Sequence, residues 1–138
     1  MTKRESIIGA FLSALSPASG VSGRVFRSRQ EAMTREEAPS IIVQPEQEQP
    51  SEDTIGQIDA RLTVSVAVYH RGAQPDALAD SVIESAHGLI MQDTTLGGLS
   101  VDLTEGETSW EFDEADQPAV LVTMRFVVWY RRNRTSLN

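Results

Sequence analysis

The side chains that could carry acid–base or metal chemistry are few in this 138-residue sequence, and they lie far apart. There are two histidines, His70 at the end of an alternating segment and His87 within a helical pattern. Their spacing does not match a pair of metal ligands, so ordinary surface or packed histidines are favoured over ligands or general bases. No serine lies in a Gly-x-Ser-x-Gly setting, and the absence of cysteine removes thiolate catalysis and disulfides. The sequence predicts no catalytic residue and no enzyme activity.

An acidic cluster and a glycine pair are the remaining candidates for a ligand site. The spacing of the acidic residues differs from that of an EF-hand loop, which favours a solvated turn over a site for a hard cation. This cluster consists of Glu111, Asp113, Glu114 and Asp116. Gly97 and Gly98 precede a predicted strand instead of a helix, which favours a turn over a phosphate-binding loop. We therefore predict no metal and no cofactor.

Charge is divided by segment along the chain. Six basic and two acidic side chains give residues 1–35 a net charge of +4, and four basic side chains give residues 125–138 the same value. Two basic and eighteen acidic side chains give residues 36–124 a net charge of −16. The overall charge of −8 argues against binding to nucleic acid. The segregation suits either a plain solvated surface or head-to-tail packing of identical subunits.

The chain length fits a single domain, residues 1–138, with one core. No apolar run approaches the roughly 20 residues that cross a bilayer. The apolar stretch near the N-terminus is broken by Gly9 and Ser13, which is not typical of a signal peptide. We expect a soluble protein that contacts no membrane.

Periodicity predicts two helices and several strands. One helix follows Thr2, which has capping-box spacing, and ends before Pro17. A second helix begins at Pro75 and ends before Gly97. Alternation of apolar and polar residues predicts strands at 24–27, 40–43, 57–69, 99–103, 109–112 and 119–131. The polar stretch at about 44–56 is predicted to be a mobile loop, and the residues after 131 a short flexible tail.

The last predicted strand is apolar on both faces. Two helices cover only one face of a sheet, so the second face, which carries Trp129 and Arg131, is expected to meet a partner. Trp110 is expected in the core. The predicted fold class is α+β, with a largely antiparallel sheet, two helices packed on one face, and assembly into a ring.

Candidate interface residues come from the charged segments and this second face. The arginines either keep a strand edge soluble or contact an acidic neighbouring subunit. Trp is enriched at binding hot spots. The predicted interface residues are Arg24, Arg27, Arg29, Arg35, Glu46, Glu48, Glu52, Asp53, Trp129 and Arg131.

The order of these elements resembles the tail terminator family of long-tailed bacteriophages, also called minor tail protein U-like or tail completion proteins. The resemblance covers almost the whole chain and lies in the order and spacing of its pieces. These are the first helix with Ile7, Ile8, Phe11 and Leu12, the segments Gly23–Arg29 and Pro39–Val43, the strand Leu62–Val68, the helix from Pro75, the turn Leu96–Gly98, and Phe126–Tyr130.

The resemblance implies a non-enzymatic virion protein of the tail or neck, assembled in the cytoplasm of the host bacterium. Such proteins form a ring, usually of six subunits, that sits on the tail tube protein, stops tube polymerisation and meets a neck or head-completion protein. DNA passes through the lumen of the ring without specific binding. Two alternatives remain open at this level: a head-completion or neck connector subunit, and a small bacterial ligand-binding or catalytic α+β domain.

Overall fold

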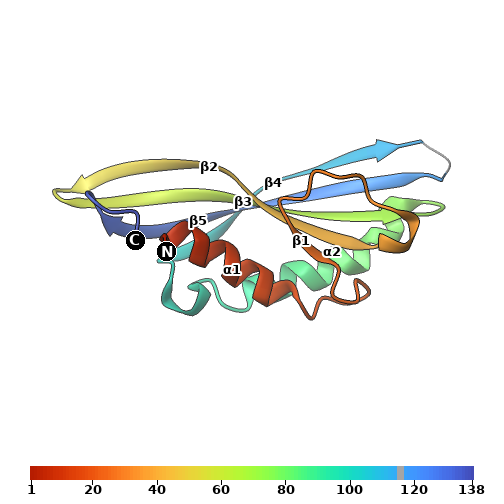
Figure 1. Ribbon diagram of the computed structural model, residues 1–138, viewed down its shortest axis with the longest axis horizontal. Coiled ribbons are helices and arrows are strands. Elements are labelled where there is room, and N and C mark those ends of the chain that lie inside the picture. The colour runs from red at the N-terminus through yellow and green to blue at the C-terminus, as the bar shows by residue number, and fades with distance from the viewer. Residues whose placement is uncertain (115–116) are drawn as a thin grey trace.

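The computed structural model describes residues 1–114 and 117–138, apart from the side chain of Arg35 (Figure 1). The helices are α1 (Lys3–Leu15) and α2 (Pro75–Met91), with short 3-10 turns η1 (Arg35–Glu37) and η2 (Leu96–Gly98). The strands are β1 (Val25–Arg27), β2 (Ser40–Thr54), β3 (Gln57–Arg71), β4 (Asp102–Asp113) and β5 (Ala119–Asn133). The predicted cluster member Asp116 lies outside the described residues.

The five strands form one sheet in the order β1-β2-β3-β5-β4. β1 pairs with β2 in parallel, and the other three pairs are antiparallel. Both helices lie on the same face of the sheet, below it in Figure 1. The predicted α+β class, with a largely antiparallel sheet and two helices on one face, is confirmed.

The two helices begin where the sequence predicts. The Thr2 hydroxyl accepts a hydrogen bond from the Glu5 amide at 3.2 Å and so caps α1. Pro75 opens α2 at a position where no intrahelical N–H donor is needed. The buried sides of both helices pack on the sheet and consist of Ile7, Ile8, Phe11 and Leu15 in α1 and Ala79, Val82, Ala86 and Ile90 in α2.

The core lies between these helices and the alternating faces of β3 and β5. Val64 lies opposite Phe126 in the ladder, and both are buried. The Phe126 ring meets the Phe11 ring edge-on, with centroids 6.0 Å apart. Because β3 and β5 pair over 15 positions, the buried apolar residues of the two strands form one continuous layer.

The predicted loop at 44–56 is wrong, because residues up to Thr54 continue β2 and only a tight turn at Ile55 and Gly56 follows. Beyond β1, this part of β2 is an edge of the sheet, so the N–H groups that Pro45 and Pro50 lack are not needed by another strand. Most of the polar side chains face water, with Glu48 as an exception, and β3 supplies the register. The resulting hairpin extends past the helices as an arm (residues 50–61), at the left of Figure 1.

The two weak strands predicted at 99–103 and 109–112 are one strand, β4, with a shift of register between Glu105 and Thr108. α2 packs over β3 and β5, and β4 lies at the edge of the sheet. Trp110 is consequently 53% exposed, so its predicted place in the core is wrong.

The chain after β5, predicted as a flexible tail, turns back towards the start of the molecule. The Arg134 amide donates to the Gly56 carbonyl at 3.0 Å, and the Lys3 amide donates to the Leu137 carbonyl at 3.0 Å. The two termini therefore lie side by side, near the base of the arm (Figure 1).

Candidate subunit interfaces

The arginines predicted at an interface have partners within the chain. Arg24 donates to the Pro39 carbonyl at 2.9 Å and to the Gly20 carbonyl at 3.3 Å. Arg27 forms an ion pair with Glu5 at 2.6 Å, which ties β1 to α1. These contacts hold the segment that joins the first helix to the sheet.

Arg29 donates to a Glu37 carboxylate oxygen at 2.8 Å and lies over the Phe26 ring at 4.6 Å. Hydrogen bonds from Arg29 and from the Thr34 amide lower the pKa of Glu37 to about 2. The side chain of Arg35 lies outside the described residues. Arg29 thus holds residues 28–37 in place through its contacts with Glu37 and Phe26. This segment crosses the sheet face opposite the helices (Figure 1).

The acidic residues predicted on the loop lie on β2 instead, and each forms an ion pair or hydrogen bond with another residue of the chain. Glu46 pairs with Arg125 at 3.0 Å, and Glu52 pairs with Arg134 at 3.4 Å. Asp53 accepts from the Ser51 hydroxyl at 3.1 Å. Glu46 sits where the β2–β3 register shifts, so the irregularity points its carboxylate at β5.

Glu48 is the most buried of these acids, with 10% of its side chain exposed. Its carboxylate accepts hydrogen bonds from Arg4, whose Nε lies at 3.0 Å, and from the Tyr130 hydroxyl. Burial opposes ionisation of Glu48, but these two donors outweigh it and hold its pKa below the usual value. Burial and the neighbouring carboxylate raise the pKa of Tyr130. The triad joins α1, β2 and β5 at the base of the arm.

Trp129 and Arg131 lie on the helix-free face of the sheet, as predicted from the alternation of the last strand. The guanidinium of Arg61 lies 4.1 Å from the centre of the Trp129 ring, which is 38% exposed. Arg131 pairs with Asp59 at 2.8 Å, and both side chains remain accessible. This pair of contacts leaves an aromatic ring and a cation at the surface of the arm.

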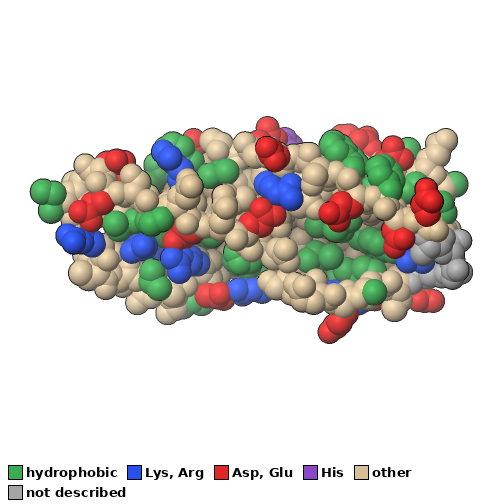
Figure 2. All heavy atoms as spheres, turned by 90° about the horizontal axis from the view of Figure 1, so that it is seen from above, with side chains coloured by type: hydrophobic (Ala, Val, Ile, Leu, Met, Phe, Trp, Pro, Cys, Tyr) green, Lys and Arg blue, Asp and Glu red, His purple; other side chains and the backbone are tan. Residues whose placement is uncertain are grey.

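The middle of the helix-free face is apolar and half-buried. Figure 2 looks onto this face and shows hydrophobic side chains gathered in a shallow depression. The register places Ile42 beside Ala67, and Ala67 beside Thr123. Leu121 and Met33 line a cavity of about 340 Å³ at one end of it. Residues 28–37 cover only part of this face, so the described residues leave the second apolar face of β5 without a full cover.

Charge is divided along the long axis of the molecule. Residues 72–114, which include α2 and β4, hold ten acidic side chains and no lysine or arginine. The arm end carries four arginines and three acids, so its charges nearly balance: Arg61, Arg131, Arg132 and Arg134 beside Glu52, Asp53 and Asp59. In Figure 2 basic and acidic side chains are mixed towards the left, while the charged side chains towards the right are mostly acidic. The two ends of one subunit therefore differ in charge, since one is strongly acidic and the other is nearly balanced.

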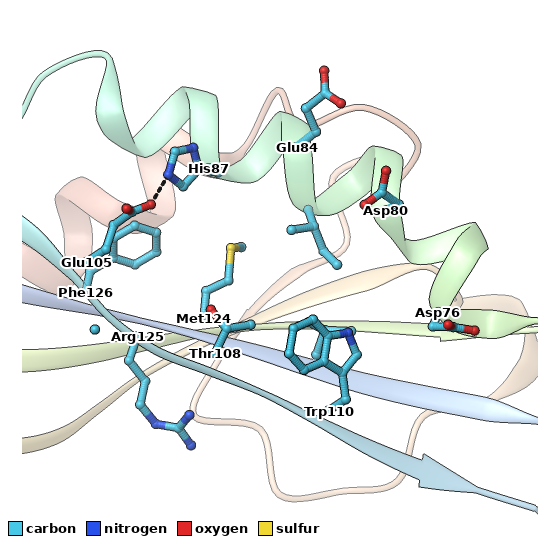
Figure 3. Close-up of a pocket in the computed structure, with 13 residues that line it drawn as sticks. Asp76, Asp80, Glu84, His87, Glu105, Thr108, Trp110, Met124, Arg125 and Phe126 are labelled. Atoms are coloured by element: carbon cyan, nitrogen blue, oxygen red, sulfur yellow. Dashed lines mark hydrogen bonds and ion pairs between the residues drawn. The ribbon is translucent and has the colours of Figure 1, made fainter.

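A groove of about 410 Å³ lies between α2 and β4 (Figure 3). Its floor is apolar, and its acidic rim comes from both elements: Ile83, Trp110, Val122, Met124 and Phe126 form the floor, and Asp76, Asp80, Glu84 and Glu105 form the rim. His87 on α2 contacts the Glu105 carboxylate across one end. The sequence did not predict this groove. The acidic residues on either side of Trp110 in the sequence were the one signal for it.

No family model matches the sequence, and no curated protein matches it. The structure is similar to a chain of the "Virion of native gene transfer agent (GTA) particle", with a TM-score of 0.64 and 11% sequence identity. The match covers 91% of this chain and 95% of that chain. At this identity the match establishes a shared fold over nearly the whole length of both chains.

Between residues 1–114 and 117–138, no three His, Cys, Asp or Glu side chains gather closely enough to hold a metal ion. Within the same ranges, no helix is long and apolar enough to cross a membrane. Among the described residues, the prominent surface features are the helix-free face, the arm and the groove.

Proposed function

We propose that this chain is a structural subunit of a virion and, more narrowly, a tail terminator that forms a ring on the end of a tail tube. The observation that carries the proposal is the shared fold with a virion chain over 91% and 95% of the two lengths. The resemblance to tail terminators rests on separate grounds, the order of elements in the sequence. Both lines support a structural protein of a virion, and the narrower role as a tail terminator rests on the second line alone.

The proposed action is occupancy of the growing end. Tube subunits add through a repeating heterologous surface, so growth has no intrinsic end until a different subunit covers that surface. A ring of this chain covers it on one side and offers the neck or head-completion protein its other side. No bond is made or broken, so the function needs surfaces and no catalytic group.

The division of charge supports a ring through which DNA passes. Unlike ends on one subunit favour head-to-tail contact between copies, the geometry that closes rings. The acids of residues 72–114 repel phosphates, so acids that face the lumen let DNA slide without specific binding. Trp129 and Arg131 are proposed contacts with a neighbouring virion protein, because both remain accessible.

Removal of the gene from the particle that carries it tests the proposal. Electron microscopy should then show full heads that stay unjoined and tails of abnormal, mostly excessive length. Tails of normal length that lack heads would instead assign the chain to the neck or head-completion position. Normal infectious particles would contradict any structural role in the virion.

A further inference from the structure

The outer edge of β4 is an open end of the sheet. β4 lies last in the strand order, and among the described strands it pairs with β5 alone. Its register shifts between Glu105 and Thr108, and residues 108–113 then pair with β5 without a break. A shift of this kind disrupts the regular row of backbone groups along a strand. Residues 108–113 are therefore the part of β4 whose outer N–H and C=O groups can pair regularly with a further strand.

The chain guards its two open edges differently. On the other side of the sheet, the part of β2 beyond its pairing with β1 is also an edge, and it contains Pro45 and Pro50. Proline lacks the N–H group that a strand ladder needs, so it hinders the addition of another strand. β4 contains no proline. Its edge is consequently able to accept one.

The side chains of residues 108–113 define what such a strand must carry. Trp110 and Phe112 point to the face that carries the helices, yet they are 53% and 61% exposed, because α2 packs over β3 and β5. Glu111 and Asp113 alternate with them on the helix-free face, and both are exposed. Apolar side chains that lie opposite each other on neighbouring strands stabilise the ladder, and so do opposite charges. A matching strand therefore has apolar side chains beside the two aromatic rings and basic side chains beside the two carboxylates.

The groove extends this match on the helix side. Its apolar floor continues from Trp110 to Met124 of β5, so an apolar side chain placed beside Trp110 also covers the floor. The exposed carboxylates of Asp80 and Glu84 face the groove from α2 (Figure 3). Residues 72–114 hold no lysine or arginine, so the field over the edge is negative. This field repels the phosphates of nucleic acid and favours a cationic protein segment.

The basic side chains that line the groove do not offset its rim. Arg125 turns its guanidinium away from the groove and pairs with Glu46 at 3.0 Å (Figure 3). His87 contacts the Glu105 carboxylate at one end of the groove. Neither side chain pairs with the carboxylates of α2, which are thus left for a partner.

The described part of a second copy has no strand of this kind to offer. Pairing of two β4 edges would set Glu111 and Asp113 among the acids of the other copy, and like charges in such positions destabilise a ladder. The free edge of β1 is three residues long, and that of β2 is interrupted by proline. β5 extends past its pairing with β4 only at residues 130–133, where Arg131 is already paired with Asp59. The occupant is accordingly a different protein.

We infer that residues 108–113 of β4, together with the adjoining groove, bind an extended segment of another protein in which apolar and basic side chains alternate. The segment adds to the sheet as a strand. Its apolar side chains cover Trp110 and Phe112, and its basic side chains pair with Glu111 and Asp113. The inference goes beyond the proposed function and does not depend on it, since the edge and the groove belong to a single subunit.

A synthetic peptide tests the inference. The probe is a short peptide, blocked at both ends, in which lysine and valine alternate. The chain has two tryptophans, so Trp129→Phe leaves Trp110 as the one indole, and its fluorescence reports whether the edge is covered. Titration with the probe should give a saturable shift of the emission to shorter wavelength.

Two peptides of the same composition and charge are the controls for the probe. In one, the valines are grouped together, so the alternation is lost. The other keeps the alternation but is methylated at every backbone nitrogen, so it donates no backbone hydrogen bond. Both should bind more weakly than the probe by about tenfold or more, because a strand needs both the side-chain pattern and the ladder.

Charge reversal on β4 locates the site. Glu111→Lys should weaken binding of the probe by about three- to tenfold, because it sets like charges opposite each other. Asp102→Lys is the matched control, with the same change of net charge on the same face of the same strand, but on the other side of the register shift. It should change the affinity by less than about twofold, since exposed charges at such a distance are screened by salt. Both side chains are exposed, and circular dichroism should show both variants folded.

The other outcomes overturn the inference. Equal affinity for the three peptides would mean attraction by charge alone, and equal effects of the two reversals would mean that net charge governs binding. A probe that causes no change in Trp110 fluorescence would show that it does not cover the edge. A dimer of the free protein that dissociates on Glu111→Lys would assign the edge to a second copy of this chain.

Discussion

Glu48→Gln should destabilise the fold at neutral pH by about 1 to 2 kcal/mol. Removing one partner of a fully buried ion pair costs roughly 3 to 5 kcal/mol, but exposed pairs contribute under about 1 kcal/mol. Glu48 is nearly buried while 40% of the Arg4 side chain is exposed, so the cost lies between these limits. For a chain of 138 residues, the melting temperature should fall by about 3 to 7 °C.

Thermal unfolding followed by circular dichroism across a pH series is the measurement. The pKa of Glu48 in the folded protein is lowered below its unfolded value of about 4.3. The stabilisation from its charge is therefore fully present above that pH and is lost as pH falls through the lower folded pKa. The gap between wild type and Glu48→Gln should accordingly narrow in acid.

Glu46→Gln is the matched control, with the same change on the same strand. Its partner Arg125 lies at 3.0 Å, but both side chains are accessible to water, so we expect a loss of about 0.5 kcal/mol or less. Equal losses from the two variants, or a gap that does not depend on pH, would refute the assignment of Glu48 to a buried network at the base of the arm.

Three further outcomes follow from the packing. Phe126→Ala should lower the free energy of unfolding by about 3 to 5 kcal/mol in urea titrations, because it opens a cavity between α1 and the sheet. Gly72→Ala should lower the free energy of unfolding by about 1 to 3 kcal/mol, because Gly72 has a backbone φ of +141° and an added Cβ would lie 2.7 Å from Leu78 Cδ1. Adding Leu78→Ala to this variant should recover part of the loss. Trp129→Ala should lower the free energy of unfolding of the free protein by about 1 kcal/mol or less in the same titrations, yet reduce its incorporation into particles. A large loss of monomer stability would instead place the Trp129 side chain in the core.

The elements with strong periodicity were predictable from the sequence. The first helix has a cap at Thr2 and apolar residues at helical intervals, and the structure places α1 there. β3 and β5 alternate because one face of each is buried under the helices, so the pattern records the burial. The helix-free side of β5, with Trp129 exposed on it, followed from the same alternation.

The second half of β2 was not predictable from local pattern. Most of its side chains face water, so the residues from Gln44 to Thr54 carry no apolar alternation, and their pairing with β3 makes them a strand. The groove was not predictable from local pattern either, because it depends on the order of strands in the sheet. β5 lies between β3 and β4, which brings β4 beside α2 although Glu105 and Asp80 are distant in sequence.

β3 is hydrogen-bonded to β2 on one side and to β5 on the other over nearly its full length. The strands run along the long axis of the molecule, so tension along that axis loads both ladders in shear, and many hydrogen bonds share the load (Figure 1). Tension across the sheet would instead peel the ladder one bond at a time, most readily at β1, which is three residues long. The subunit is thus mechanically anisotropic, stiff along the arm and weak across it.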